Sequence, residues 1–151
     1  MYTVDIVINM LSWHNSPEDQ KMGIALARQL CRLDSLFQPF TNGYSKDVWN
    51  NCALVISDFS DNELLPFISE MLFWLQDMNW PGAEIIQKRL VSFQKTQELA
   101  ETLDGLIEKC IASADDIWLA NLAELLRNPD LIPYLKREAY SALYCSQHRE
   151  S

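Results

Sequence analysis

Histidine, glycine and clustered basic residues are scarce in this sequence. Among its 151 residues are 2 histidines, 4 glycines and 12 lysines plus arginines, against 21 acidic residues. The resulting net charge of −9 disfavours a nucleic-acid partner, because binding to a phosphate backbone needs clustered Lys and Arg. With little glycine and only short β-branched runs, helix is expected for most of the length.

The sequence also lacks the common signatures of catalysis and metal binding. Its two histidines, His14 and His148, lie near opposite ends, and no H-E-x-x-H motif or cysteine grouping indicates a metal site. The fingerprints G-x-S-x-G, Walker A and G-x-G-x-x-G are missing as well. We therefore predict that the chain has no catalytic residues, binds no metal or cofactor, and is not an enzyme.

Two carboxylate pairs could suggest acid–base chemistry. Asp58 and Asp61 form the first pair, and Asp115 and Asp116 form the second. We expect all four at helix starts, where acidic side chains interact favourably with the helix dipole. This structural role is preferred over catalysis.

The amino terminus and the cysteines both indicate a cytoplasmic protein. The first segment carries Asp5 and no basic region, unlike a secretory signal, and no apolar run approaches the roughly 20 residues of a membrane helix. The cysteines show no C-x-x-C spacing, so we expect reduced thiols buried as small apolar groups at positions 31, 52, 110 and 145. No membrane partner is predicted.

The chain is long enough for one domain, and its sequence repeats weakly. The hydrophobic content of 48% supports a continuous core over residues 1–151. Pro66 and Pro133 occupy similar segments, 62–68 and 129–135, and are 133 − 66 = 67 residues apart. Half of this spacing is about 33 or 34 residues, as in two-helix repeats.

Aromatic residues follow the same period. Trp49, Trp80 and Trp118 fall in the first turns of predicted helices, and Phe59 and Phe93 close two of them, 34 residues apart. The pattern predicts first helices at about 46–59, 81–93 and 115–127, and second helices at about 62–77, 96–113 and 130–145.

An abbreviated unit precedes these repeats. Residues 3–13 are expected to form a capping helix, followed by a helix that Ser16 caps and in which Pro17 takes the first position. One face of that helix is traced at helical spacing by Met22, Ala25, Leu26, Gln29, Leu30 and Leu33. A truncated second helix follows at 36–40.

No single hairpin of this kind can cover its own apolar stripe. Stacked neighbours can, so the fold class we predict is all-α, a right-handed stack of antiparallel helical hairpins. It would contain about three full repeats plus an N-terminal cap.

One helix carries a candidate acidic surface. Glu98, Glu101, Asp104 and Glu108 share a face opposite the apolar residues of the segment 98–111. An ordinary solvated face explains these acids, and steering of a basic partner is the functional alternative.

The segment 72–83 joins a second helix to the next first helix. Two tryptophans bracket its turn, and Asn79 is expected to cap the following helix. The structural interpretation is a corner that locks two repeats together. The functional alternative is an exposed aromatic and amide patch that grips a protein or peptide, comprising Trp74, Gln76, Asp77, Asn79 and Trp80.

The residues from Trp74 to Ala83, with the sequence WLQDMNWPGA, resemble the signature of a small bacterial helical-repeat family of unknown function. The segment 9–13, the helix start at Ser16 and Pro17, and the segment 116–118 are also similar to that group. The resemblance implies a HEAT-like or armadillo-like fold and an association with toxin–immunity systems. It supplies no catalytic residue.

Three functions remain open. The preferred one is a protein-interaction or scaffolding module, in a more specific form an immunity protein that binds a toxin. A helical-repeat enzyme acting on nucleic-acid bases is the second, with a small basic cluster at Lys88, Arg89 and Lys95. The third is a self-associating structural unit, in which aromatic residues Tyr134, Tyr140 and Tyr144 would contact a second copy.

Overall fold

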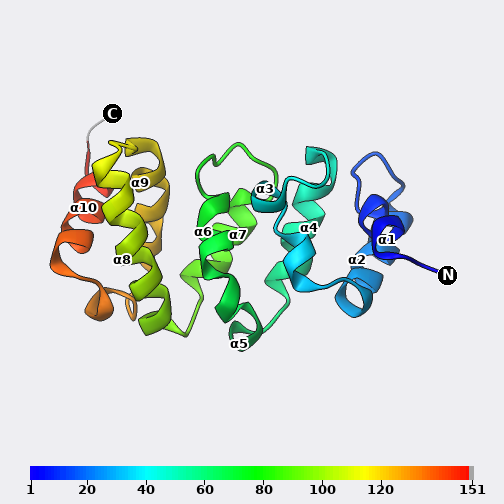
Figure 1. Cartoon of the computed structure of the whole chain (residues 1–151), viewed down its shortest axis with the longest axis horizontal. Helices are drawn as coiled ribbons and strands as arrows, with labels where there is room; N and C mark the ends of the chain where they lie inside the picture. Colours follow the sequence, from blue (N-terminus) through cyan, green and yellow to red (C-terminus); the bar gives the residue numbers. More distant parts are fainter. Residues whose placement is uncertain (150–151) are drawn as a thin grey trace.

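The computed structural model describes residues 1–149, and this part of the chain contains helices and no strands. The helices follow one another along the long axis of an elongated molecule, and the N-terminus and C-terminus lie at opposite ends (Figure 1). The all-α prediction is therefore confirmed.

The N-terminal part starts as the sequence predicts. The Ser16 hydroxyl accepts a hydrogen bond from the Asp19 amide at 3.2 Å, and Pro17 is the first residue of α2. The helical elements here are α1 (Val4–Met10), α2 (Pro17–Leu30), a 3-10 turn (Leu33–Leu36) and α3 (Gln38–Thr41).

The middle and C-terminal parts contain helical elements close to the predicted positions. The middle elements are a 3-10 turn (Lys46–Val48), α4 (Trp49–Ser57), α5 (Asp61–Leu64), a 3-10 turn (Leu65–Phe67), α6 (Ile68–Trp74) and α7 (Ala83–Val91). The C-terminal elements are α8 (Thr96–Ala112), α9 (Asp116–Ala123), 3-10 turns at Glu124–Arg127 and Ile132–Tyr134, and α10 (Arg137–Gln147).

The prolines interrupt two helices that the sequence predicts as continuous. Pro66 and Pro133 each lie in a 3-10 turn shortly before a helix, α6 in one case and α10 in the other. Proline lacks an amide N–H and its ring crowds the preceding turn, so the helix breaks at these positions. The predicted spans 62–77 and 130–145 are each divided, and both prolines occupy a 3-10 turn ahead of the longer helix.

Phe59 and Phe93 have similar surroundings in the structure. Phe59 and Phe93 each lie two residues beyond a helix, and each carbonyl accepts a hydrogen bond from a later side chain. Arg89 donates to Phe59 at 3.0 Å, and Asn128 donates to Phe93 at 2.9 Å. Both phenylalanines therefore follow a helix end and connect it to a later segment of the chain.

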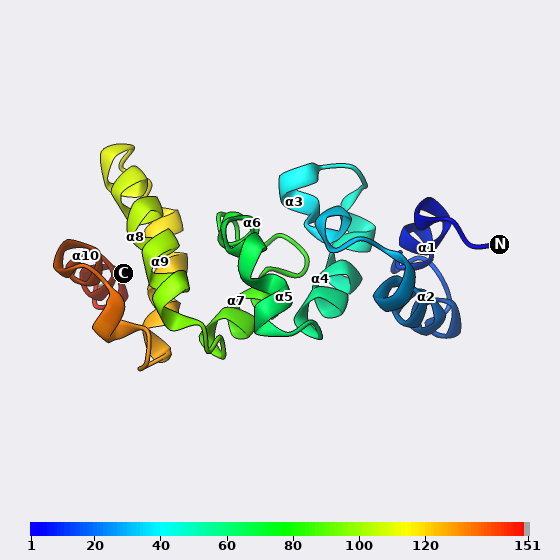
Figure 2. The ribbon, with the colours of Figure 1, turned by 60° about the horizontal axis from the view of Figure 1, so that its bottom comes forward.

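The buried side chains form one core cluster that extends from Val7 to Leu143. Along the chain α1 packs on α2, α2 on α4, α4 on α7, and α7 on the 3-10 turn after α9. A second row is formed by α3, α6 and α8, and α10 packs on both α8 and α9. Figure 2 shows this succession of helices from another side.

The buried face of α2 is formed by small residues. Gly23 and Ala27 are buried, whereas Met22, Ala25 and Leu30 are exposed, as is Gln29. A Cβ at Gly23 would lie 2.8 Å from Met10 Cβ, so the small residue lets α1 approach α2 closely. The helix uses its small residues for packing, which leaves its larger apolar stripe outside.

The carboxylate pairs lie at helix ends, with one difference from the prediction. Asp61 and Asp116 are first residues of α5 and α9, and Asp115 caps α9 through the Trp118 amide at 3.1 Å. Asp58 instead follows the C-terminus of α4, where the expected dipole interaction is absent, and it pairs with Arg28 of α2.

The four cysteines are free thiols. Cys52 and Cys110 are buried and Cys31 is half-buried, but Cys145 is exposed, so the prediction of four buried thiols was wrong for Cys145. Among the described residues no helix is long and apolar enough to span a membrane.

Candidate functional site

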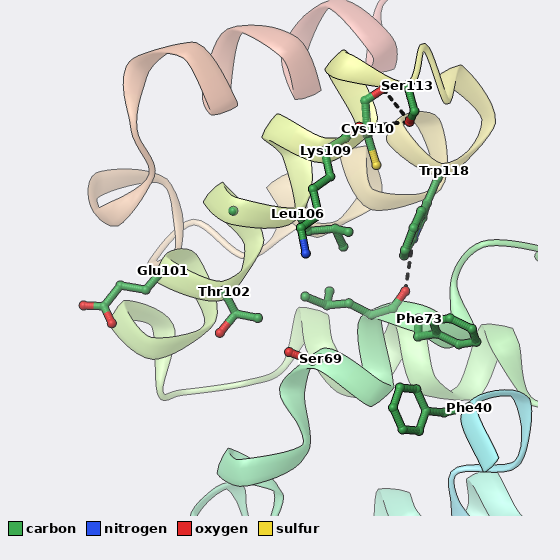
Figure 3. A pocket seen from close by; sticks show the side chains of 12 residues that line it. Phe40, Ser69, Phe73, Glu101, Thr102, Leu106, Lys109, Cys110, Ser113 and Trp118 are labelled. Carbon is green, nitrogen blue, oxygen red and sulfur yellow. Dashed lines mark hydrogen bonds between the residues drawn. The ribbon is translucent and has the colours of Figure 1, made fainter.

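A groove opens between α6, α8 and α9, with Phe40 of α3 at its edge (Figure 3). Its cavity volume is about 460 Å³, within the range typical of binding pockets. The lining is mostly apolar, and its main apolar side chains are Phe40, Leu72, Phe73, Leu106, Cys110 and Trp118.

Hydrogen bonds fix Trp118 in the wall of the groove. Asp115 starts α9 and thereby places Trp118 within its first turn. The Trp118 indole N–H then donates to the carbonyl of Leu72 at 3.1 Å, which ties α9 to α6 across the groove. The indole N–H has its hydrogen-bond acceptor within the protein, so the Trp118 ring is a fixed apolar wall.

Phe73 connects the groove to the rest of an aromatic cluster. Its ring centroid lies 5.5 Å from that of Phe40, 6.4 Å from Trp80 and 6.4 Å from Trp118. These distances suit edge-to-face and offset contacts. Phe40 is nevertheless 55% exposed, so the cluster ends in an aromatic ring that the domain itself does not cover.

The rim of the groove is polar and carries both signs of charge. Glu101 and Lys109, two turns apart on α8, are exposed and line it, together with Thr102 of the same helix. Gly105 lies between them, and a Cβ built there meets no atom within 4 Å. The absent side chain at Gly105 therefore keeps the groove open on the α8 side.

Of the two tryptophans in the predicted aromatic patch, Trp74 belongs to the core and Trp80 is half-buried. Trp74 is fully buried, and its indole N–H donates to the carbonyl of Pro81 at 3.0 Å. Trp80 is half-buried, with its ring 5.8 Å from Trp49. Trp74 thus locks the α6–α7 corner, as the structural interpretation predicts, and does not contribute to an exposed patch.

The polar residues of this corner mainly shape the turn. Asp77 Oδ1 accepts from the Asn79 amide at 2.8 Å, and Gln76 Nε2 donates to the Phe73 carbonyl at 3.3 Å. Asn79 is exposed but does not cap α7, whose N-cap is Gly82. Glycine is required there because φ is +87° and the Trp74 ring lies 3.0 Å from the Cβ position.

Three of the four predicted surface acids are exposed on α8. Glu98, Glu101 and Glu108 face solvent. Asp104 is buried, and its Oδ1 accepts from the Lys136 amide at 3.1 Å. Its assignment to the acidic surface was wrong, because the segment before α10 packs over this side of α8.

Packing removes Arg89 from the predicted basic cluster of Lys88, Arg89 and Lys95. Lys88 is exposed, but Arg89 is directed to Asp61 and the carbonyls of Ser57 and Phe59. Arg89 therefore serves to join neighbouring units. The remaining lysines give weak support for a phosphate-binding surface.

Sequence reasoning missed the groove and several of its residues, above all Phe40, Gly105 and Lys109. The sequence held one indication of the groove, because Phe40 belongs to the truncated helix predicted at 36–40, which is too short to bury it. The pairing of α3 with α6 and of α6 with α8, which brings these residues together, depends on contacts between distant parts of the chain.

The thiol of Cys110 is a weak nucleophile. Burial, with a smaller contribution from the Asp115 carboxylate, raises the pKa of Cys110 to about 11. The thiol is therefore protonated at neutral pH, and the reactive thiolate is rare. Among the described residues no three His, Cys, Asp or Glu side chains are grouped so as to hold a metal ion.

Residues 50–142 match the family model for a domain of unknown function, DUF5071. The chain belongs to this family. Comparisons with curated proteins and with solved structures gave no match. The predicted membership of a family of unknown function is confirmed. The DUF5071 region runs from α4 to α10 and contains every groove residue except Phe40.

Proposed function

We propose that this DUF5071 domain is a protein-interaction module that binds a partner segment in the groove between α6 and α8. The observation that supports it most is the partly exposed aromatic wall formed by Phe40, Phe73 and Trp118 beside an open cavity. Exposed aromatic side chains around a pocket are typical of surfaces that accept an apolar anchor of a partner.

Charge supports a basic partner segment. The chain has a net charge of −9, and Glu98, Glu101 and Glu108 lie along the exposed side of α8. Glu101 itself lines the groove. A segment with one large apolar side chain for the cavity and lysine or arginine toward Glu101 fits this arrangement, and such attraction mainly raises the association rate.

The groove also gives the bound segment a direction. Lys109 lies two helical turns from Glu101 at the other part of the rim. The basic flank is expected near Glu101, and the opposite flank near Lys109 is expected to be neutral or acidic. An immunity protein that binds a toxin through such a segment is the more specific form of this proposal.

The HEAT-like or armadillo-like superhelix belongs to the same proposal. Hydrogen bonds between units support it, since they join residues about one period apart: Gln87 with Asn121, and Asn128 with Phe93. An experimental structure would test it through the rotation between successive helix pairs. A constant right-handed rotation supports the superhelix, and alternating rotations would contradict it.

A test of the groove can use Gly105. A Gly105→Leu variant places a side chain at the mouth of the cavity, and α8 should become more stable because glycine is a poor helix former. We expect binding to be lost while the fold is retained. The probe is a peptide library with one aromatic anchor and flanking lysines, read by fluorescence polarisation at low salt.

Two further variants make this test specific. Ala120→Leu adds a similar side chain at an exposed position of α9 outside the groove and should leave binding unchanged. Trp80→Ala tests the alternative corner site. If Trp80→Ala abolishes binding while Gly105→Leu does not, the groove assignment is wrong and the α6–α7 corner is the site. No binding of any library member would contradict the proposed partner class.

A further inference from the structure

Two charged side chains that line the groove have no charged partner within the protein. Glu101 and Lys109 are exposed on α8 and take part in none of the ion pairs found among the described residues. Gly105 contributes to this, because it lies four residues after Glu101 and four residues before Lys109, where a helical side chain could pair with either charge. Both charges are therefore available to a bound molecule.

Lys109 is the charge that reaches into the groove. Figure 3 shows its side chain beside Leu106 with the ammonium directed into the groove, whereas the Glu101 carboxylate points away from the cavity. Lys109 and Leu106 are three residues apart and so lie next to each other on one face of α8. An apolar anchor that contacts Leu106 therefore has the ammonium directly beside it.

Ser69 supplies a second donor from the opposite wall. It lies in the first turn of α6, and no described residue accepts a hydrogen bond from its exposed hydroxyl. The other hydroxyl groups that line the groove are used by α8 itself. Thr102 donates to the Glu98 carbonyl at 3.2 Å. Ser113 donates to the Lys109 carbonyl at 2.9 Å. The strong donors left among the lining residues are an ammonium and a hydroxyl, which suit the two oxygens of a carboxylate.

The closeness of these donors to the apolar anchor distinguishes a chain end from an internal acidic residue. In an extended segment the two neighbours of the anchor point away from the groove, and the next side chain on the same face lies roughly 7 Å along the segment. A carboxylate that lies beside the anchor is therefore the main-chain carboxylate of a terminal residue.

We propose that the groove binds the C-terminal residue of a partner protein. The last side chain, aromatic or large and aliphatic, fills the cavity beside Leu106 and Trp118. Its α-carboxylate binds the Lys109 ammonium and the Ser69 hydroxyl. This inference rests on the proposed function and specifies the partner segment as a free chain end.

The spacing of the two charges sets the rest of the segment. Glu101 and Lys109 are 109 − 101 = 8 residues apart, which is about 12 Å along α8 and is spanned by three or four extended residues. A lysine or arginine three or four positions before the C-terminus therefore lies near Glu101. The segment runs in the same direction as α8.

The test compares one peptide with a free and with an amidated C-terminus. The probe is a fluorescein-labelled lysine–alanine–alanine–phenylalanine peptide, and fluorescence polarisation at low salt measures its dissociation constant. We expect the free acid to bind about tenfold more tightly than the amide, because the amide loses the charge-assisted contact with the ammonium. A third peptide carries two further alanines after the phenylalanine and should bind as weakly as the amide.

Variants of the groove locate the carboxylate. Lys109→Gln should lower the affinity for the free acid to that for the amide, and it should leave the affinity for the amide unchanged. Ser69→Ala should weaken binding of the free acid by a smaller factor, about threefold. Lys88→Gln, at an exposed position of α7 outside the groove, is the matched control and should change neither affinity. All three positions are exposed, so circular dichroism should show a normal fold.

Failure of this inference differs from failure of the proposed function. Equal binding of the free acid, the amide and the extended peptide, unchanged in Lys109→Gln, would overturn the chain-end assignment and leave the groove as a binding site. Competition by N-acetylphenylalanine as effective as that by the unlabelled peptide would also overturn it, because the site would then take a small aromatic acid. If none of the peptides binds, the proposed function fails together with this inference.

Discussion

The guanidinium of Arg89 binds the carboxylate of Asp61, 28 residues earlier in the chain, and both side chains are largely buried, at 14% and 18% exposure. Arg89 also donates to the carbonyls of Ser57 and Phe59, at 3.2 and 3.0 Å. Asp61 in turn accepts from the Gln94 amide at 2.9 Å. The pair therefore joins the end of α4 to α7 and satisfies backbone groups on both sides.

Removal of this arginine should be far more damaging than removal of a surface arginine. Arg89→Met leaves Asp61 without its cation and two carbonyls without a donor, so we expect a loss of about 3 kcal/mol in the free energy of unfolding. Urea unfolding followed by circular dichroism measures it. Arg28→Met is the matched control, because the Arg28–Asp58 pair is about half exposed and should contribute less than about 1 kcal/mol. Equal losses in the two variants would contradict this account.

The α6–α7 corner depends on Gly82. A Cβ there would lie 2.7 Å from Ala53 Cβ and 3.0 Å from the Trp49 carbonyl oxygen, and φ is +87°. Gly82→Ala should therefore lower the unfolding free energy by about 2–4 kcal/mol. Gly105→Ala, in the open middle of α8, should raise it by about 1 kcal/mol. Thermal unfolding of both variants measures these two opposite changes in stability. A Gly82→Ala variant as stable as the wild type would show that the corner can adjust to the added Cβ.

The cysteines should differ widely in reactivity. The thiolate is the form that reacts with iodoacetamide, and Cys110 has a pKa of about 11 and is buried, so its alkylation at pH 8 should be very slow. Its rate should rise about tenfold per pH unit between pH 7 and 9 without levelling off, because this range lies below the pKa. Burial raises the pKa of Cys52 further, and Cys52 should stay unmodified in the folded protein.

Exposed Cys145 is the internal control for this experiment and should be modified first. Peptide mapping by mass spectrometry identifies the modified sites, and unfolding in urea should make all positions reactive. Rapid modification of Cys110 at pH 7 would show that the groove is more open than the structure indicates.

Features set by local sequence were predicted well. The start of α2 at Pro17 follows from a serine cap and the fixed φ of proline, and both act within one turn. The predicted helix 96–113 is found as Thr96–Ala112, because its apolar residues repeat at helical spacing without an internal proline. The equivalence of Phe59 and Phe93 was likewise readable from their spacing.

The wrong predictions concern residues whose burial depends on which face of their helix another element covers. Periodicity showed that Met22 and Leu30 lie on one face of α2, but it could not show that Gly23 and Ala27 form the closer contact with α1. Asp104 has the spacing of a surface acid, yet the chain before α10 covers it. Helical spacing groups residues on a face without specifying which face the next element covers.

The sequence by itself determined an acidic helical chain, because composition, capping residues and apolar spacing act locally. Only the tertiary structure decided that Phe40, Phe73, Leu106 and Trp118 surround one groove, that Trp74 is core, and that the α2 stripe is exposed. These outcomes depend on how closely different helices approach one another, and that distance is set by small side chains and by hydrogen bonds between helices.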